Sequence, residues 1–217
     1  MKQFFRYLGI LLWKAKYLII IVLVLVAGFG GFYLYKQNRD SDIWKKAEDH
    51  YRRADYTKTA TELKKVGMPS SAEKLKIYGQ TMFAVKDYSA SEKAYLKLYD
   101  LNKDVFAKIM VGNIANQQKK YDKAIKSYRE VIKNNPNYIA AYSNLAIVYR
   151  SMGNNAEAIK VAEDGIKNNP GNTEMYMLLI SLLAIDEKSK DTDQYKQAVE
   201  KLKKIDPNNQ LLKQLEV

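Results

Sequence analysis

Cysteine is absent from this 217-residue sequence, and histidine occurs once. Without thiols the chain has no disulfide, no zinc-thiolate site, no lipidated-cysteine anchor and no cysteine nucleophile. His50 alone would have to serve any catalytic triad or histidine-ligated metal site. We therefore expect a protein that is not an enzyme and that holds no cofactor and no metal.

Signatures of other ligands are also missing. The acidic stretch 186–193 lacks the glycine and the closing glutamate that an EF-hand needs at fixed offsets. Gly28, Gly30 and Gly31 lie inside an apolar run, so they form no phosphate-binding loop between a strand and a helix. The lysines of residues 119–126 alternate with apolar positions and are accompanied by acids, which indicates a solvated helix face and no nucleic-acid partner.

The chain does have a marked excess of positive charge, with a formal net charge of +12. The first 39 residues include basic residues but no acid. These basic residues flank the uncharged apolar stretch 17–35. As a helix rising about 1.5 Å per residue, this stretch approaches the roughly 30 Å thickness of a bilayer core. Tyrosines stand at both of its ends, as is typical of membrane interfaces. We expect a transmembrane helix over 17–35, a basic, amphipathic N-terminal segment over 1–16 and a linker over 36–41.

A cleaved signal peptide is the competing interpretation, because Ala27 and Gly28 resemble a cleavage site. The apolar run continues beyond that site to Tyr35, and cleavage would leave it exposed to water, so an uncleaved signal anchor is favoured. Bases without acids precede the run, whereas acids follow it closely, which predicts a cytoplasmic N-terminus. The rest of the chain would then lie outside the cytoplasm, at the outer face of a bacterial inner membrane. Ala27 and Gly31 form a small-xxx-small pair that would let two spans associate into a homo-oligomer.

Beyond residue 40, apolar residues recur at spacings of three and four, which predicts helices throughout. Two similar stretches end at Pro136 and Pro170, which lie 34 residues apart. They read YDKAIKSYREVIKNNPN at 121–137 and NAEAIKVAEDGIKNNPGN at 155–172. A fixed period of this length indicates stacked pairs of helices, each of which buries the apolar face of its neighbour.

These stretches resemble the tetratricopeptide repeat family, in which a degenerate 34-residue unit forms two antiparallel helices with small residues at their crossing. Residues 139–172 match it best, through Tyr142, Leu145, Ala146, Tyr149, Ala158, Ala162, Gly165 and Pro170. The resemblance implies an all-α chain in which the single transmembrane helix is followed by a helix-turn-helix solenoid of about five repeats over 42–207. The expected repeats are 40–71, 72–104, 105–138, 139–172 and 173–207, and 208–217 would form a C-terminal capping helix.

In this family the first helices of the repeats line a concave groove, and the resemblance implies that partners bind there. The candidate partner-binding residues are Lys76, Gln80, Phe83, Ile109, Asn113, Asn116, Ser143, Asn144, Ile147 and Arg150. Asn113 and Asn144 match two asparagines with which some family members hold a peptide's terminal carboxylate. However, Ile109, Glu174 and Leu178 stand where the cations of that clamp would be. We therefore expect the groove to bind an extended segment or a helix of a protein partner.

The sequence thus predicts a membrane-anchored scaffold or adaptor that contacts the lipid bilayer through residues 17–35 and a protein partner through its groove. The resemblance includes anchored bacterial proteins whose repeats assist assembly or secretion, so we expect such a role in a cell-envelope complex. A membrane-anchored targeting or import receptor that faces the cytosol is the alternative, and it requires the reverse topology. An enzyme or regulator whose active site forms only at an interface is a third hypothesis, and it would show turnover that survives purification.

Overall fold

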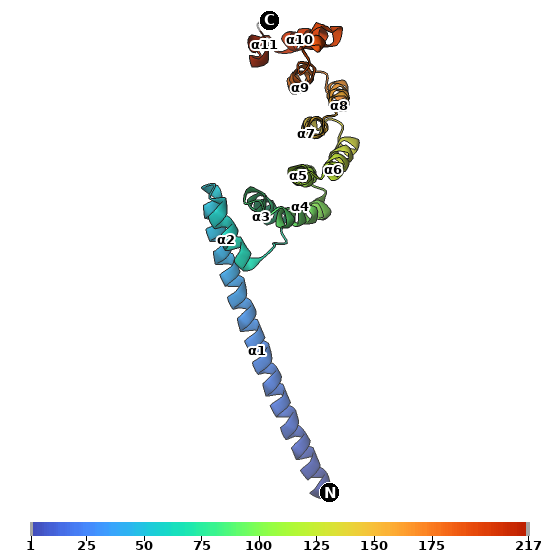
Figure 1. Ribbon diagram of the computed structural model, residues 1–217. Helices are drawn as coiled ribbons and strands as arrows, with labels where there is room; N and C mark the ends of the chain where they lie inside the picture. Colours follow the sequence, from blue (N-terminus) through green and yellow to red (C-terminus); the bar gives the residue numbers. More distant parts are fainter. Residues whose placement is uncertain (1, 216–217) are drawn as a thin grey trace. The chain divides into compact units, whose positions relative to one another are not determined.

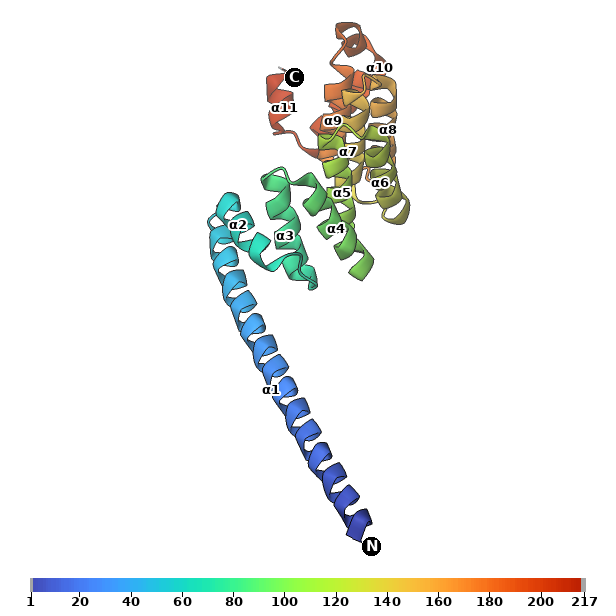
Figure 2. The ribbon, with the colours of Figure 1, turned by 60° about the horizontal axis from the view of Figure 1, so that its bottom comes forward.

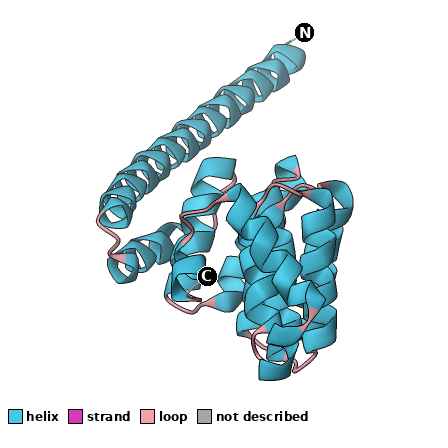
Figure 3. Cartoon of the chain, turned by 90° about the horizontal axis from the view of Figure 1, so that it is seen from above, coloured by secondary structure: helices cyan, strands magenta, loops and turns pink. Residues whose placement is uncertain are grey.

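The computed structural model describes residues 2–215, and the side chains of residues 2–17, 19–21 and 187 lie outside the described part. The described chain consists of helices and connecting loops (Figure 3). It divides into two units, Met1–Pro69 and Ser70–Val217, which are described in turn.

The first unit is a helical hairpin of α1 (Lys2–Arg52) and α2 (Tyr56–Val66). Four apolar side chains, two from each helix, are buried in the hairpin: Trp44, Ala47, Ala60 and Leu63. Asp55 begins α2 by accepting a hydrogen bond from the backbone N–H of Lys58, which satisfies one of the free donors of the first turn. Residues 40–71, where the first repeat is expected, contain the end of α1 and the whole of α2.

Residues 36–41, which we expected to form a linker, lie within α1, a continuous helix of 51 residues. The sequence has no proline and no glycine between Gly31 and the end of α1 at Arg52, so no such residue interrupts the backbone hydrogen bonds of α1 there. The prediction of a linker is therefore wrong. The apolar stretch continues without a break into the first helix of the hairpin.

The apolar part of α1 exposes its described side chains in every direction. Residues 22–26 and 32–35 are consecutive along the helix and have side chains between 49% and 65% exposed. The expected N-terminal segment 1–16, together with Tyr17 and residues 19–21 of the expected span, has side chains outside the described part. Within the part that is described, no helix has both the length and the apolar character needed to cross a membrane.

The second unit consists of four helix pairs and a short closing helix. The pairs are α3 (Ala72–Ala84) with α4 (Tyr88–Asn102), α5 (Val105–Gln117) with α6 (Tyr121–Asn134), α7 (Ile139–Ser151) with α8 (Asn155–Asn168), and α9 (Thr173–Leu183) with α10 (Asp193–Ile205). A 3-10 helix, η1 (Glu187–Asp191), lies between α9 and α10, and α11 (Gln210–Gln214) closes the unit. The four pairs lie within residues 72–104, 105–138, 139–172 and 173–207, and α11 lies within 208–217.

The pairs of the second unit stack into an arc (Figure 1). The first helices α3, α5, α7 and α9 lie on its inner side, and the second helices α4, α6, α8 and α10 lie on its outer side; Figure 2 shows the same stack from another direction. The inner helices α5, α7 and α9 also contact one another across the repeats. The concave surface is thus built from the first helices, as the resemblance implied.

Small residues let the two helices of a pair approach closely. A β-carbon on Gly112 would lie 2.5 Å from Cε1 of Tyr128, and one on Gly79 would lie 2.9 Å from the ring of Tyr95. The tyrosine rings therefore fill the space that the glycines leave, which gives the close packing of a protein interior. This packing holds the inner helices in a defined orientation.

Candidate functional site

The inner surface of the second unit is the candidate site, and hydrogen bonds between first helices hold it together. Asn144 Nδ2 on α7 donates to Asn113 Oδ1 on α5 at 3.1 Å. Ser143 Oγ on α7 donates to Glu174 Oε1 on α9 at 2.8 Å. The partners in each bond are 31 residues apart, so equivalent faces of successive helices meet here.

Asn113 is held by further contacts within its own repeat. Its Oδ1 also accepts a hydrogen bond from the Tyr128 hydroxyl at 2.6 Å, and its Nδ2 lies 3.6 Å from Met110 Sδ. Burial raises the pKa of Tyr128, so the phenol remains protonated and able to donate. Both polar groups of Asn113 are engaged, whereas Asn144 Oδ1 has no hydrogen-bond partner among the described residues.

Two large apolar side chains open onto the same surface. Phe106 is 40% exposed and Ile147 is 37% exposed. Phe106 lies two turns before Asn113 on one face of α5, and Ile147 has the place on α7 that Asn113 has on α5. The inner surface therefore offers apolar contact on either side of an amide pair.

Cations of the inner helices are largely neutralised. Lys76 Nζ on α3 lies 2.8 Å from Asp104 Oδ2. Burial of Asp104 disfavours its ionised form, but the hydrogen bonds from Lys76 and from the Ala107 N–H outweigh it and hold the pKa of Asp104 below its ordinary value. Lys108 on α5 is paired with Glu130 at 2.7 Å. Lys108 and Glu130 line a cleft between α4, α5 and α6. Among the described residues of the groove, Lys76 is thus engaged by an acid and is not free to hold a terminal carboxylate.

The ten predicted groove residues do not share one environment. Lys76, Gln80, Ile147 and Arg150 are exposed, Phe83, Asn113, Asn116, Ser143 and Asn144 are half-buried, and Ile109 is buried. Ile109 is 5% exposed and belongs to the core that continues through the following repeats, so it offers no surface to a partner. Sequence reasoning also missed Phe106, although its spacing of seven residues from Asn113 would have placed it on the same helix face.

Two family models of the tetratricopeptide repeat match this chain, over residues 79–139 and 115–182. Among curated proteins, the Hsp70-Hsp90 organizing protein 3 of Arabidopsis thaliana is 37% identical over 99 residues, which cover 46% of this chain and 17% of that protein. The Hsp70-Hsp90 organizing protein of Triticum aestivum is 32% identical over 184 residues, which cover 82% of this chain and 27% of that protein. The chain thus spans only 17% to 27% of the length of these two relatives.

Solved structures of MamA have the same fold. A crystal structure of MamA is 24% identical in sequence, and the match covers 73% of this chain and 95% of the MamA chain, with a TM-score of 0.57. MamA of Desulfovibrio magneticus RS-1 is 17% identical in sequence, and the match covers 79% of this chain and 97% of that MamA chain, also with a TM-score of 0.57. Residues 79–182 of this chain are therefore tetratricopeptide repeats, and they form part of an all-α solenoid of the kind that serves as a scaffold for protein interactions.

Proposed function

We propose that this protein is a membrane-anchored adaptor that binds a segment of a partner protein along the groove lined by α3, α5, α7 and α9. The observation that carries the proposal is the inner surface itself, where exposed Phe106 and Ile147 lie on either side of the Asn113–Asn144 pair. An apolar side chain of the partner would cover Ile147. A backbone N–H of the partner would donate to the free Asn144 Oδ1.

The chemistry of the groove favours an internal segment over a carboxylate tail. The names of the curated relatives connect those proteins with Hsp70 and Hsp90. In this chain, however, the ammonium group of Lys76 is already paired with Asp104, and Glu174 adds negative charge to the groove. We therefore infer that the bound segment is an extended strand or a helix with apolar side chains.

The anchor is proposed from the composition and exposure of α1. Residues 22–26 and 32–35 are apolar and exposed on all sides, and no other described part of the first unit covers them. Lipid would remove this surface from water, with a gain of about 25 cal/mol for each Å² of apolar area. The basic residues that precede the run favour a cytoplasmic N-terminus, with the repeats outside the cytoplasm.

Anchoring would concentrate the groove beside partners in the same membrane, so a weak contact would suffice for capture. We propose that these partners are components of a cell-envelope complex, whose assembly or secretion the protein assists. A receptor that faces the cytosol differs from this proposal in its topology, so protease accessibility separates the two. Digestion of the repeats once the outer barrier is opened supports the proposal, whereas digestion only after the cytoplasm is opened favours the receptor.

Site-specific crosslinking in intact cells tests the groove. A photoreactive phenylalanine in place of Phe106 should crosslink one or a few proteins. Ile147→Glu should abolish these products, because a carboxylate would replace the apolar contact. Lys126→Glu, a change at another exposed residue, on α6, should leave them unchanged. Undiminished crosslinking in the Ile147→Glu variant would show that the groove is not the binding site.

A further inference from the structure

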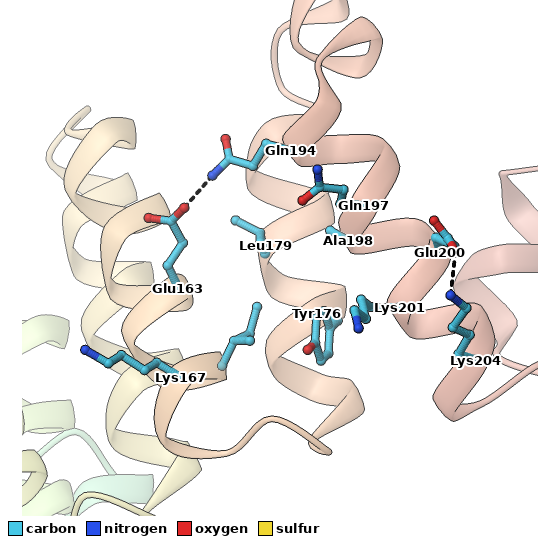
Figure 4. Close-up of a pocket in the computed structure, with 11 residues that line it drawn as sticks. Glu163, Lys167, Tyr176, Leu179, Gln194, Gln197, Ala198, Glu200, Lys201 and Lys204 are labelled. Atoms are coloured by element: carbon cyan, nitrogen blue, oxygen red, sulfur yellow. Dashed lines mark hydrogen bonds and ion pairs between the residues drawn. The ribbon is translucent and has the colours of Figure 1, made fainter.

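The outer side of the solenoid has clefts where two second helices meet the first helix between them. The cleft between α8, α9 and α10 has a volume of about 410 Å³ (Figure 4). The cleft between α6, α7 and α8 has a volume of about 360 Å³. We call the first the terminal cleft, which is lined by Ile166, Tyr176, Leu179, Gln194, Ala198 and Lys201 among others. The second is the central cleft, which is lined by Ile132, Tyr142, Leu145, Glu157, Val161 and Asp164 among others.

Both clefts have the same apolar floor. Tyr176 and Leu179 in the terminal cleft stand 34 residues after Tyr142 and Leu145 in the central one. The Tyr176 hydroxyl donates to the carbonyl oxygen of Pro170 at 3.2 Å, and the hydroxyl of Tyr142 makes the matching bond, so both rings are held in place. The floor is therefore a rigid apolar surface that is repeated from one helix pair to the next.

The second helices make the two clefts different. The buried residues of α8 and α10 correspond at an offset of 37 residues, which places Ala198 where the central cleft has Val161. Ala198 lacks two methyl groups of valine, which accounts for a larger terminal cleft. At the same offset, Lys201 stands in place of Asp164.

The terminal cleft is lined by three cations and two acids, which leaves one positive charge in excess. Glu163 Oε1 on α8 accepts a hydrogen bond from Gln194 Nε2 on α10 at 2.5 Å (Figure 4). Glu200 is paired with Lys204 at 2.6 Å. Lys167 and Lys201 also line the cleft, and neither forms a salt bridge among the described residues, although Lys201 interacts electrostatically with Glu200. In the central cleft the two lining cations are matched by two acids, so that cleft has no such excess.

We propose that the terminal cleft is a second protein-binding site, which takes a partner segment with a bulky apolar side chain flanked by carboxylates. The apolar side chain would lie on Tyr176 and Leu179 in the space beside Ala198, where it would leave water. A flanking carboxylate would pair with Lys201, which supplies the charge complementarity. The site lies on the outer side of the arc, so it would be filled independently of the inner groove.

Binding of short peptides to the full chain in detergent micelles tests this site. The probe is the peptide Gly-Glu-Phe-Glu-Gly with a para-fluorinated phenylalanine, observed by fluorine NMR, and the matched peptide has glutamine for both glutamates. We expect the acidic peptide to bind more tightly. Lys201→Gln should weaken its binding about two- to fivefold, the effect of one exposed charge pair. Glu163→Gln should strengthen binding by a similar factor, because it removes a like charge.

Ala198→Phe should abolish binding by filling the cleft, and Lys160→Gln in the central cleft should leave binding unchanged. If Ala198→Phe lowers the midpoint of thermal unfolding, its loss of binding reports on stability and not on the cleft. The test then rests on Lys201→Gln and Glu163→Gln, because both residues are exposed and the two changes must shift peptide affinity in opposite directions. Equal binding of the two peptides, no binding at all, or binding that depends on Ile147 and not on Lys201 would overturn the proposal.

Discussion

The smallest side chains of the repeats lie opposite the largest. Gly79 faces the ring of Tyr95, and Gly112 faces the ring of Tyr128. One repeat later, Ala146 has the place of the glycine and is fully buried. Each helix crossing is thus fitted by its own pair of side chains, so an added methyl group in one pair cannot be absorbed by the others.

Gly112→Ala tests this fit. The new β-carbon would lie 2.5 Å from Cε1 of Tyr128, whose hydroxyl is bonded to Asn113, so the ring cannot move without breaking that bond. We expect a loss of about 1–3 kcal/mol in the free energy of unfolding, measured with urea. Gly171→Ala is the matched control, since nothing lies within 4 Å of its β-carbon, and it should change stability by less than about 0.5 kcal/mol. Equal stability of the two variants would mean that the crossing is looser than described.

Glu130 gives one inter-helix contact a dependence on pH. Lys108 Nζ lies 2.7 Å from its carboxylate, and this hydrogen bond is the main cause that holds the pKa of Glu130 below its ordinary value of 4.5. Burial opposes the shift, and a hydrogen bond from the Tyr99 hydroxyl assists it. Because the pKa is lower in the folded state, the contact stabilises the fold above about pH 4.5, and this stabilisation is lost as the pH falls through the folded pKa.

Glu130→Gln should therefore lower stability by about 0.2–1 kcal/mol at pH 7, the range of a salt bridge that solvent still reaches, since both partners are only half-buried. The difference from the wild type should shrink as the pH falls below about 4.5, because the wild-type glutamate is then protonated as well. Urea unfolding at a series of pH values checks both points. A difference that stays constant down to pH 3 would show that the charge of Glu130 contributes nothing.

At the scale of the elements, the turns within the helix pairs share an unusual backbone conformation. The same turn position has a positive φ of 56° at Ala54, 62° at Lys86, 57° at Lys119 and 79° at Gly153. Three of the four turns adopt this left-handed conformation without glycine, at a cost of about 1–2 kcal/mol each. Packing of the two helices therefore determines the turn, and the turn residue adapts to it.

Lys119→Gly should stabilise the fold by up to about 1 kcal/mol. Removal of the β-carbon relieves the left-handed strain, and the greater freedom of glycine in the unfolded chain offsets part of the gain. Gly153→Lys is the reciprocal change and should destabilise the fold by a similar amount. Urea unfolding measures the stability of both variants. A loss of stability in the Lys119→Gly variant would contradict the strain argued for this turn.

The positions of the helices were predictable because their signals are local. The 34-residue spacing of Pro136 and Pro170 and the apolar period place α5 to α8 close to their observed bounds. The burial of Ile109 was not predictable in this way, since it depends on packing against a later repeat. The continuation of α1 through 36–41 has one local signal, the absence of proline and glycine, but this absence permits a helix without requiring one.

At the scale of the whole second unit, the solenoid is held by contacts between neighbouring helices. Its core continues from α5 to α11 without depending on contacts between distant repeats. Stability is then approximately a sum over repeats and their interfaces. At the C-terminal end the five-residue helix α11 covers the last pair, and it buries Leu212, which is 2% exposed.

Leu212→Ala should therefore loosen the end of the solenoid and leave its centre intact. Loss of a buried leucine costs about 2–5 kcal/mol locally, so α9 and α10 should exchange their amide hydrogens faster. Exchange in α5 and α6 should stay unchanged, because their neighbours are unaffected. Ala146→Trp, which overfills a central crossing, should instead speed exchange in the helices on both sides of α7. Hydrogen exchange read by mass spectrometry distinguishes these patterns, and a uniform increase from α3 to α10 in the Leu212→Ala variant would show that the unit unfolds as one cooperative block.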